Sequence, residues 1–373
     1  MDQVGTPQQV LADVRIKEER VRGFLEREGL DALVIGRQDN FAWVTAGGDN
    51  HIVITSEMGA GYLVIGRDRK WLVTYSMDRQ RFLDEYAASQ GYEVAALFWY
   101  QGSPEDKILD LTRGMKVGAD FALPGARRYG NELVDLHYPL TDLELERYRW
   151  IGQAANRILT AVAHDLPPGT TEQEIATRLL YEYAVEGFTI DVLLVGTDER
   201  ISRYRHTVPT DKPLERYALL HPAARRWGLH ANVTRLLHFG EPPTDIRRAM
   251  DAVAMVGASV TTMLAPGVRF ADILEEEIRL HKRSGYPSEW CNHFQGGITG
   301  YTLADPARCR NPEARVVERQ AFDYFITVTG AKFEELTLLT EDGIEIASLG
   351  AGWPTRRVQT SRGDIVVPDV LIR

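Results

Sequence analysis

The chain has 373 residues, of which 44% are hydrophobic and 26% are charged, and this is the composition of an ordinary soluble globular protein. That length is long for one hydrophobic core, so two domains are expected. The net charge of −10 argues against nucleic acid as a partner, because binding to nucleic acid needs a basic face. The first residues contain no apolar run of signal-peptide length, and no apolar stretch of about twenty residues occurs, so we expect neither a membrane span nor a membrane partner.

Helix and strand signals alternate in the first part of the chain. Residues 12–30 predict an amphipathic helix, because Val14, Val21 and Leu25 recur at roughly helical spacing among charged residues. Short apolar runs predict strands at residues 32–35, 52–55, 61–65, 70–74 and 92–98, and a helix is expected near 77–89. The alternation continues to about residue 136 and predicts a compact N-terminal α/β domain over residues 1–138.

A second domain is expected over residues 139–373. Thr141 followed by Glu144 has the spacing of a capping box and predicts the start of a long helix that ends near residue 164. The run Pro167-Pro168-Gly169 breaks that helix, and Thr171 begins another that ends near residue 186.

A weak internal repeat runs through this second domain. The Pro168-Gly169 turn, with the leucine before it and the isoleucine after it, is echoed 98 residues later at Pro266-Gly267. Each copy lies between two helical stretches and precedes strand-like sequence. A unit of this kind that occurs twice predicts a duplicated α/β domain with a pseudo-two-fold axis.

Only two cysteines occur, Cys291 and Cys309. This scarcity predicts a reducing, cytoplasmic location, and it excludes both a disulfide framework and a cysteine-based zinc site.

The most informative segment is residues 219–241, LLHPAARRWGLHANVTRLLHFGE. Within it, the run from Asn232 to Arg235 is followed by an apolar pair and by Phe239-Gly240-Glu241. This pattern resembles the Asp-Ile-Thr-Arg-Thr segment and the following turn of the creatinase/aminopeptidase P/prolidase family. The resemblance extends over nearly the whole chain. It implies an α/β (α+β) fold in which a creatinase-type N-terminal domain precedes a duplicated pita-bread domain.

The family's peptidases hold two divalent metals with five ligands, namely two Asp, one His and two Glu. The resemblance places these ligands at His221, Asn232, Gly297, Phe325 and Glu334 of this chain. Only Glu334 keeps the family's residue type. Two neighbouring divalent cations need several anionic oxygens, so the resemblance implies that the dinuclear metal site is lost, and we expect no metal and no cofactor. A single metal held by His221, Glu334 and either His206 or His230 remains an alternative.

His206 is the expected acid/base. It stands in Arg203-Tyr204-Arg205-His206-Thr207, which resembles a family segment whose histidine moves protons in creatinase, an enzyme that works without metal. An imidazole titrates near neutral pH and can both accept and donate a proton. By the same resemblance, Glu334 orients His206 or binds a substrate cation. Without the family context, a surface histidine or a histidine with its hydrogen bonds satisfied at the end of a strand is the favoured interpretation of His206.

Further residues are expected to bind the substrate. His221 and His230 fall on paired strands that face the pocket, and Asn232 fills a former ligand position. His293 matches the first histidine of the family's His-x-x-Gly-His run.

Arg203 and Tyr301 complete this set of predicted substrate-binding residues. Arg203 has the geometry to bind a substrate carboxylate in a bidentate manner, although an exposed salt bridge is the commoner use of such an arginine. Tyr301 ends the glycine-rich run from Gln295, which lacks the pattern of a phosphate loop and suits close approach of backbone to a ligand.

Three functions fit these observations. The first is a metal-independent, creatinase-like hydrolase or lyase that acts on a C–N bond of a small amine, amide or guanidine metabolite. The second is a non-catalytic homologue that binds a small molecule or a protein, and the third is an Xaa-Pro-type peptidase with a single metal. Polar, histidine-rich pocket positions favour the first, and the family resemblance implies a homodimer.

Overall fold

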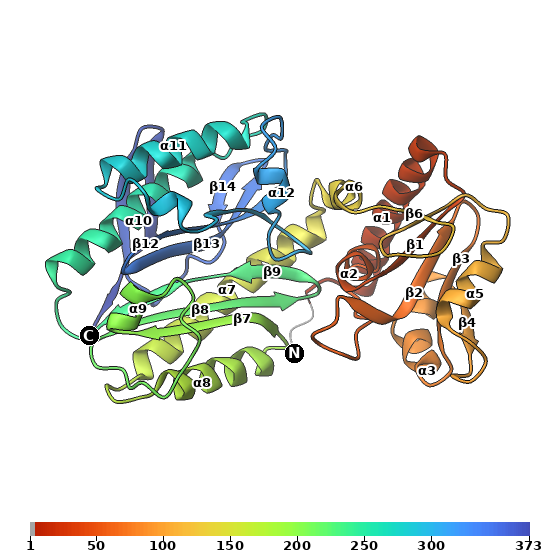
Figure 1. Cartoon of the computed structure of the whole chain (residues 1–373), viewed down its shortest axis with the longest axis horizontal. Coiled ribbons are helices and arrows are strands. Elements are labelled where there is room, and N and C mark those ends of the chain that lie inside the picture. The colour runs from red at the N-terminus through yellow and green to blue at the C-terminus, as the bar shows by residue number, and fades with distance from the viewer. Residues whose placement is uncertain (1–3) are drawn as a thin grey trace. The chain divides into compact units, whose positions relative to one another are not determined.

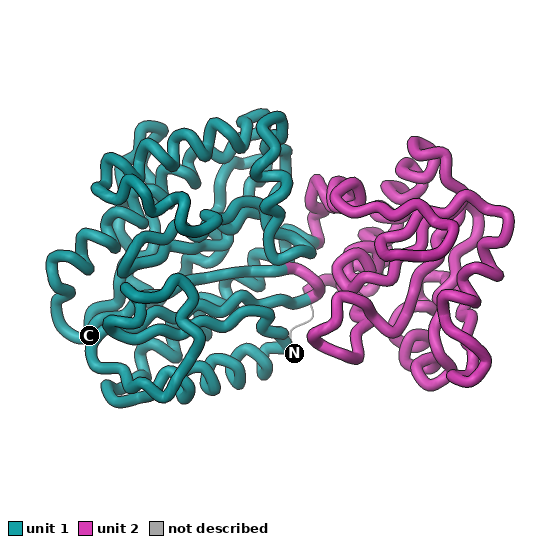
Figure 2. The backbone as a smooth tube through the Cα atoms, in the orientation of Figure 1, with its two compact units in different colours: residues 1–2, 144–226, 230–373 teal, residues 3–143, 227–229 magenta. Residues whose placement is uncertain are grey.

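A computed structural model describes residues 4–373, which divide into two compact units (Figure 1, Figure 2). The smaller unit extends to Leu143 and includes residues 227–229. The larger unit comprises Glu144–Arg226 and His230–Arg373.

The smaller unit is built on a six-stranded mixed sheet with the order β4-β3-β2-β1-β5-β6. β2 is antiparallel to β1 and β3, whereas β1–β5, β3–β4 and β5–β6 are parallel. The strands are β1 (Ala32–Arg37), β2 (Met58–Gly66), β3 (Lys70–Tyr75), β4 (Glu93–Leu97), β5 (Val117–Ala119) and β6 (Arg127–Arg128). Apolar side chains from neighbouring strands, such as Val34, Val64 and Val73, are buried together and form the core of this unit.

Helices surround this sheet. They are α1 (Pro7–Glu28), α2 (Gln38–Val44), α3 (Arg79–Phe82), η1 (Leu83–Ala87), α4 (Ala88–Gln90), α5 (Pro104–Leu111), α6 (Asn131–Val134) and η2 (Asp135–His137). α1 begins five residues before the predicted helix, because Thr6 and Gln9 form a capping box and Pro7 occupies the first turn. It ends at Gly29, whose φ of 65° suits a glycine.

Two predictions for this unit were wrong. Residues 52–55 form an exposed turn rather than a strand, and the side chain of Val53 is 60% exposed. β1 ends at Arg37, which pairs with Met58 at the start of β2. No residue of β1 therefore remains to pair with residues 52–55. The single helix expected at 77–89 is divided by the π-helical segment η1.

The larger unit contains two main sheets with helix pairs along them. One sheet has the order β17-β10-β8-β7 with β9 beside β8, and the other has the order β11-β12-β13-β14. The strands are β7 (Thr189–Thr197), β8 (Tyr217–Arg226), β9 (Leu229–Asn232), β10 (Arg235–His238), β11 (Gly296–Thr299), β12 (Gln320–Val328), β13 (Ala331–Thr340), β14 (Gly343–Ile346), β15 (Thr355–Thr360), β16 (Gly363–Pro368) and β17 (Leu371–Ile372).

Each main sheet is accompanied by two long helices (Figure 1). α7 and α8 lie along the sheet of β7 and β8, and α10 and α11 lie along the sheet of β12 and β13. The helices of this unit are α7 (Asp142–Asp165), α8 (Glu172–Val185), α9 (Glu199–Arg203), α10 (Thr244–Met263), α11 (Phe270–Arg283), η3 (Glu289–Cys291) and α12 (Pro306–Cys309).

The duplication predicted from the repeat is confirmed by equivalent backbone hydrogen bonds. The Gly169 N–H donates to the Leu214 carbonyl at 2.7 Å, and the Gly267 N–H, 98 residues later, donates to the Val316 carbonyl at 2.8 Å. The return bonds also match, since Leu214 donates to Thr170 and Val316 donates to Val268. Both glycines have left-handed φ values, 91° and 86°. The same turn therefore joins each helix pair.

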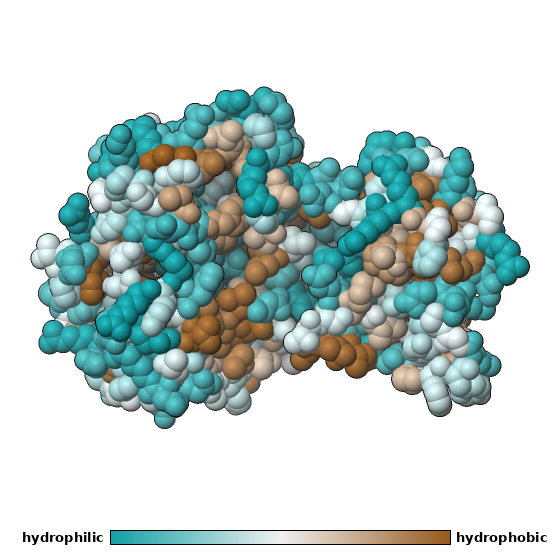
Figure 3. Space-filling view, viewed as in Figure 1, coloured by the Kyte–Doolittle hydropathy of each residue, from teal (hydrophilic) through white to brown (hydrophobic). Residues whose placement is uncertain are grey.

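Within residues 4–373, no helix is both long enough and apolar enough to cross a membrane. Hydrophilic side chains cover most of the face seen in Figure 3, and apolar side chains gather there in separate patches on both units.

The two turn glycines give a test of the duplication. We expect Gly169→Ala and Gly267→Ala each to lower the free energy of unfolding by about 1–2 kcal/mol, because a Cβ disfavours left-handed backbone. Neither glycine has an atom within 4 Å of the added Cβ, so backbone strain is the only cost. The control is Gly23→Ala in α1, which also has open space and should raise stability by about 0.5–1 kcal/mol. Urea unfolding measures all three, and an unchanged free energy at both turns would contradict the assignment.

Candidate functional site

The centre of the site is Glu334, in the middle of β13. Side chains alternate between the two faces of a strand, so Lys332 and Glu334 share one face and Glu335 lies on the other. Glu335 forms an ion pair with Arg235 and accepts a hydrogen bond from Ser348. The face of β13 that carries Glu334 therefore also carries a lysine, Lys332, whereas Glu335 lies on the opposite face.

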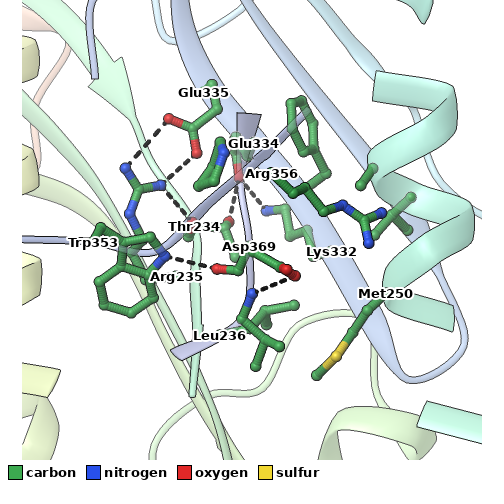
Figure 4. A pocket seen from close by; sticks show the side chains of 15 residues that line it. Thr234, Arg235, Leu236, Met250, Lys332, Glu334, Glu335, Trp353, Arg356 and Asp369 are labelled. Carbon is green, nitrogen blue, oxygen red and sulfur yellow. Dashed lines mark hydrogen bonds and ion pairs between the residues drawn. The ribbon is translucent and has the colours of Figure 1, made fainter. Parts of the chain in front are cut away.

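Three polar groups contact a single oxygen of Glu334. Lys332 Nζ lies 2.7 Å from Oε2, His221 Nδ1 lies 2.8 Å from it, and the Thr234 hydroxyl donates to it at 2.9 Å. Figure 4 shows Thr234 and Lys332 directed at Glu334, next to a cavity of about 30 Å³, which has room for roughly one water molecule. The four side chains are almost completely buried, with Lys332 the most exposed at 7%.

The charges in this cluster follow from burial and contact. Burial raises the pKa of Glu334, but the contacts with His221 and Lys332 lower it by more, so the net pKa is lowered. Burial lowers the pKa of His221 more than the contact with Glu334 raises it, and this favours the neutral form of the imidazole. The ammonium of Lys332 is then the cation that balances the Glu334 carboxylate.

A second pair of histidines lies beside this cluster. His206 Nε2 and His293 Nε2 are 3.1 Å apart, which is a hydrogen bond carrying one proton. The His293 ring packs edge-on against the Phe325 ring, with 5.3 Å between the ring centres. Lys332 Nζ lies 5.4 Å from the centre of the Phe325 ring. Burial, followed by the charges of Lys332 and His206, lowers the pKa of His293 to about 4. His293 is therefore neutral at pH 7, and His206 is exposed to solvent.

Asn232 and Asp323 form the next part of the site. The Asn232 backbone N–H donates to Asp323 Oδ2 at 2.9 Å. Burial, together with the charge of Glu334, raises the pKa of Asp323 well above its ordinary range, which favours the protonated form of this carboxyl. Asn232 Oδ1 and Asp323 Oδ1 are both buried without a hydrogen-bond partner among the described residues.

Gly297 stands where the family has a histidine ligand, and Cys309 occupies the space beside it. Gly297 has a φ of 152°, and a Cβ at this residue would overlap with Cys309 Sγ. A histidine at position 297 would therefore require Cys309 to move.

The residues present do not fit a pair of divalent cations. Glu334 is the charged carboxylate of the cluster, and the Lys332 ammonium already occupies its Oε2. Among residues 4–373, no group of three or more His, Cys, Asp or Glu side chains has an arrangement that could hold a metal ion. Two cations placed here would face Lys332 with too little negative charge to balance them.

The other predicted residues lie in three different environments. His230 is held between two acceptors, with Nε2 2.8 Å from Asp191 Oδ2 and Nδ1 3.1 Å from the Gly300 carbonyl. Arg203 ends α9 and is exposed. Tyr301 is buried, and its hydroxyl donates to Glu144 Oε1 at 2.7 Å. The structure thus brings His206, His221, His293 and Glu334 together around Lys332.

Two residues that matter here, Lys332 and Asp323, were not predicted from the sequence. Strand alternation would have found Lys332, because it precedes Glu334 by two residues in an apolar run. Asp323 has no comparable signal, since only the pairing of β12 with β13 places it near Glu334.

Comparisons with known proteins agree with this architecture. The sequence model of metallopeptidase family M24 matches residues 146–340. An uncharacterised peptidase of Staphylococcus saprophyticus is 23% identical over 216 residues, which are 55% of this chain and 61% of that protein. A probable dipeptidase PepE of Mycobacterium tuberculosis is 21% identical over 210 residues, 54% of this chain and 56% of that protein. The matches thus span only about 60% of these curated relatives.

Solved structures show the same fold over nearly the whole chain. Dipeptidase PepE from Mycobacterium ulcerans matches with a TM-score of 0.77 and 17% identity, covering 97% of this chain and 98% of that one. Xaa-Pro dipeptidase from Bacillus anthracis matches with a TM-score of 0.74 and 16% identity, covering 96% and 100%. These likenesses confirm the predicted fold of an N-terminal domain followed by a pita-bread domain. With a family match over more than half of its length, the chain belongs to metallopeptidase family M24.

Proposed function

We propose that this chain is a metal-independent, creatinase-like hydrolase or lyase that cleaves a C–N bond of a small amine, amide or guanidine metabolite, with His206 as the acid/base. The observation that carries the proposal is the contact of the Lys332 ammonium with Glu334. Glu334 stands at the ligand position that keeps the family's carboxylate, and its partner is a cation from the chain itself. A metal that used this carboxylate would first have to displace Lys332.

His206 suits the proton transfers of such a reaction. Hydrolysis of a C–N bond takes a proton from water and delivers one to the leaving nitrogen, and one imidazole can do both in turn. His206 is exposed and so is accessible to a substrate, whereas His293 beside it is half-buried. The neutral His293 ring fixes the direction of one His206 nitrogen through the contact at 3.1 Å.

Lys332 is proposed to bind the substrate. Its ammonium has three hydrogen-bond donors, of which one is directed at Glu334 Oε2. A second donor directed into the site would stabilise negative charge that develops on a carbonyl oxygen or on the equivalent guanidine nitrogen. Glu334 then holds the ammonium in place and is not itself the acid/base.

Two alternatives remain. A non-catalytic homologue that binds a small molecule or a protein is favoured by one observation, namely that Glu334 Oε2 is fully used by contacts within the chain. An Xaa-Pro-type peptidase with a single metal would agree with the names of the solved relatives, but it would have to release both Lys332 and His221 from Glu334.

We also infer a cytoplasmic location and a homodimer that takes a small-molecule substrate. The location is supported by the two cysteines, Cys291 and Cys309, which are both free. The homodimer is supported by the resemblance to creatinase, and the net charge of −10 supports the absence of nucleic acid as a partner.

Metal content gives the first test. We expect the purified chain to hold far less than one divalent metal per molecule, because the Lys332 ammonium already pairs with Glu334 and too little negative charge is left to hold a divalent cation. Elemental analysis by mass spectrometry measures this directly, and a chelator should leave the melting temperature unchanged. Two metals per chain would overturn the central proposal, and one would favour the peptidase.

Substitution of His206 tests the proposed acid/base. We expect His206→Ala to lower turnover about 10²–10⁴-fold, which is the usual contribution of general acid–base catalysis. Substrates would first be found by mass spectrometry of products from a panel of small amides, guanidines, amino acids and an Xaa-Pro dipeptide. The matched control is His164→Ala, an exposed histidine on α7 that should leave turnover unchanged.

An active His206→Ala variant would remove His206 from the mechanism. If a panel member raises the melting temperature of the wild type and no product forms, the non-catalytic homologue is the better description.

Stability measurements test the pairing of Lys332 with Glu334. We expect Lys332→Met to lower the free energy of unfolding by about 3–5 kcal/mol, because it leaves a buried carboxylate without its cation. The double variant with Glu334→Gln should recover at least about 1 kcal/mol of that loss. Arg149→Met is the control, since Arg149 and Glu345 form an exposed ion pair that contributes less than about 1 kcal/mol. A Lys332→Met variant as stable as the control would show that the buried pair does not form.

A further inference from the structure

A second cavity, of about 380 Å³, lies between α11 and the strands β11 and β12. Its walls are mostly apolar and aromatic, and they include Phe270, Ile273 and Leu274 of α11 together with Trp290 and Phe294. This volume and lining are those of a site for a small organic molecule. His293 also lines the cavity, but Glu334 and Lys332 do not.

One buried carboxyl group belongs to this apolar wall. Glu277 lies on the buried side of α11 and is only 2% exposed. Its Oε1 has no hydrogen-bond partner among the described residues. Burial raises the pKa of Glu277 to about 8. A buried acid without a partner destabilises a fold, and a ligand that offers a hydrogen-bond donor and a positive charge would gain from meeting it.

The other polar residues that line the cavity do not supply a positive charge to pair with Glu277. Burial raises the pKa of the Cys309 thiol to about 12, so this group is neutral. Arg310 is the cationic member of the lining, and it is exposed, where water screens its charge. The lining also includes three aromatic residues, Phe270, Trp290 and Phe294, and aromatic rings stabilise an organic cation that lies over their faces.

We propose that this cavity is a binding site for an amine with an aromatic or aliphatic body, whose ammonium pairs with Glu277. The amine enters in its neutral form and takes the proton from the Glu277 carboxyl, which leaves an ammonium–carboxylate pair with no change in overall charge. A neutral amide or alcohol of the same size gains one hydrogen bond at most. The site should therefore prefer the amine. This inference goes beyond the proposed reaction and does not depend on it.

Calorimetric titration of the full chain with benzylamine tests the proposal. We expect Glu277→Gln to weaken benzylamine binding at least tenfold while leaving the melting temperature nearly unchanged, because Gln has the shape of the protonated acid. Glu275→Gln is the matched control on the same helix, since Glu275 is exposed, and it should bind as the wild type does. Leu274→Trp should also abolish binding, because Leu274 lines the cavity, is 38% exposed, and a larger side chain there fills the space.

Each other outcome counts against the proposal. Equal affinity of the wild type and Glu277→Gln for benzylamine would show that Glu277 is not the partner. Stronger binding of benzamide or benzyl alcohol than of benzylamine would overturn the assignment to amines. No binding of benzylamine by the wild type would remove the site. Turnover plays no part in these measurements, so a chain without enzymatic activity could still bind amines here, and an active enzyme could fail this test.

Discussion

The Glu334 carboxylate is buried in the middle of β13, and a buried charge is stable only when another group neutralises it. In this chain the neutralising cation is the ammonium of Lys332, two residues earlier on the same face of the strand. His221 and Thr234 complete the contacts from the neighbouring sheet. The Lys332 charge also acts on a neighbouring group, since together with burial, the larger cause, it lowers the pKa of His293.

The same arrangement shows how the fold of metallopeptidase family M24 is kept while a lysine of the chain contacts the buried carboxylate. Buried carboxylates without a cation beside them repel one another. In this chain Glu334 is paired with Lys332, and burial together with the charge of Glu334 raises the pKa of Asp323 well above its ordinary range. Cys309 fills the space beside Gly297. The ion pair and the raised pKa of Asp323 both keep the net charge of this interior small. The backbone turns that define the duplication, at Gly169 and Gly267, are separate from this cluster.

Two different uses of a buried carboxyl group occur in one domain. The contacts with His221 and Lys332 give Glu334 a lowered pKa, whereas burial raises the pKa of Glu277 to about 8. Glu334 Oε2 is held by groups of the chain itself, but Glu277 Oε1 has no hydrogen-bond partner among residues 4–373. A ligand of the cavity beside Glu277 could therefore supply the missing partner. Near His206 and His293, Lys332 is the group proposed to bind a substrate, because Glu334 Oε2 already has its contacts within the chain.

The sequence by itself determined the fold class and the repeat, because these depend on local signals such as Pro-Gly turns, caps and a motif of fixed spacing. From the same motif it predicted the loss of the metal ligands. It also placed His206, His221, His293 and Glu334 among the site residues. Only the tertiary structure decided what these residues contact. The register of β12 and β13 places Phe325 opposite Glu334 and brings Asp323 close to it. Packing of the chain also places Cys309 beside Gly297. Such contacts join residues far apart in sequence, so their charge states and partners follow from packing and not from local pattern.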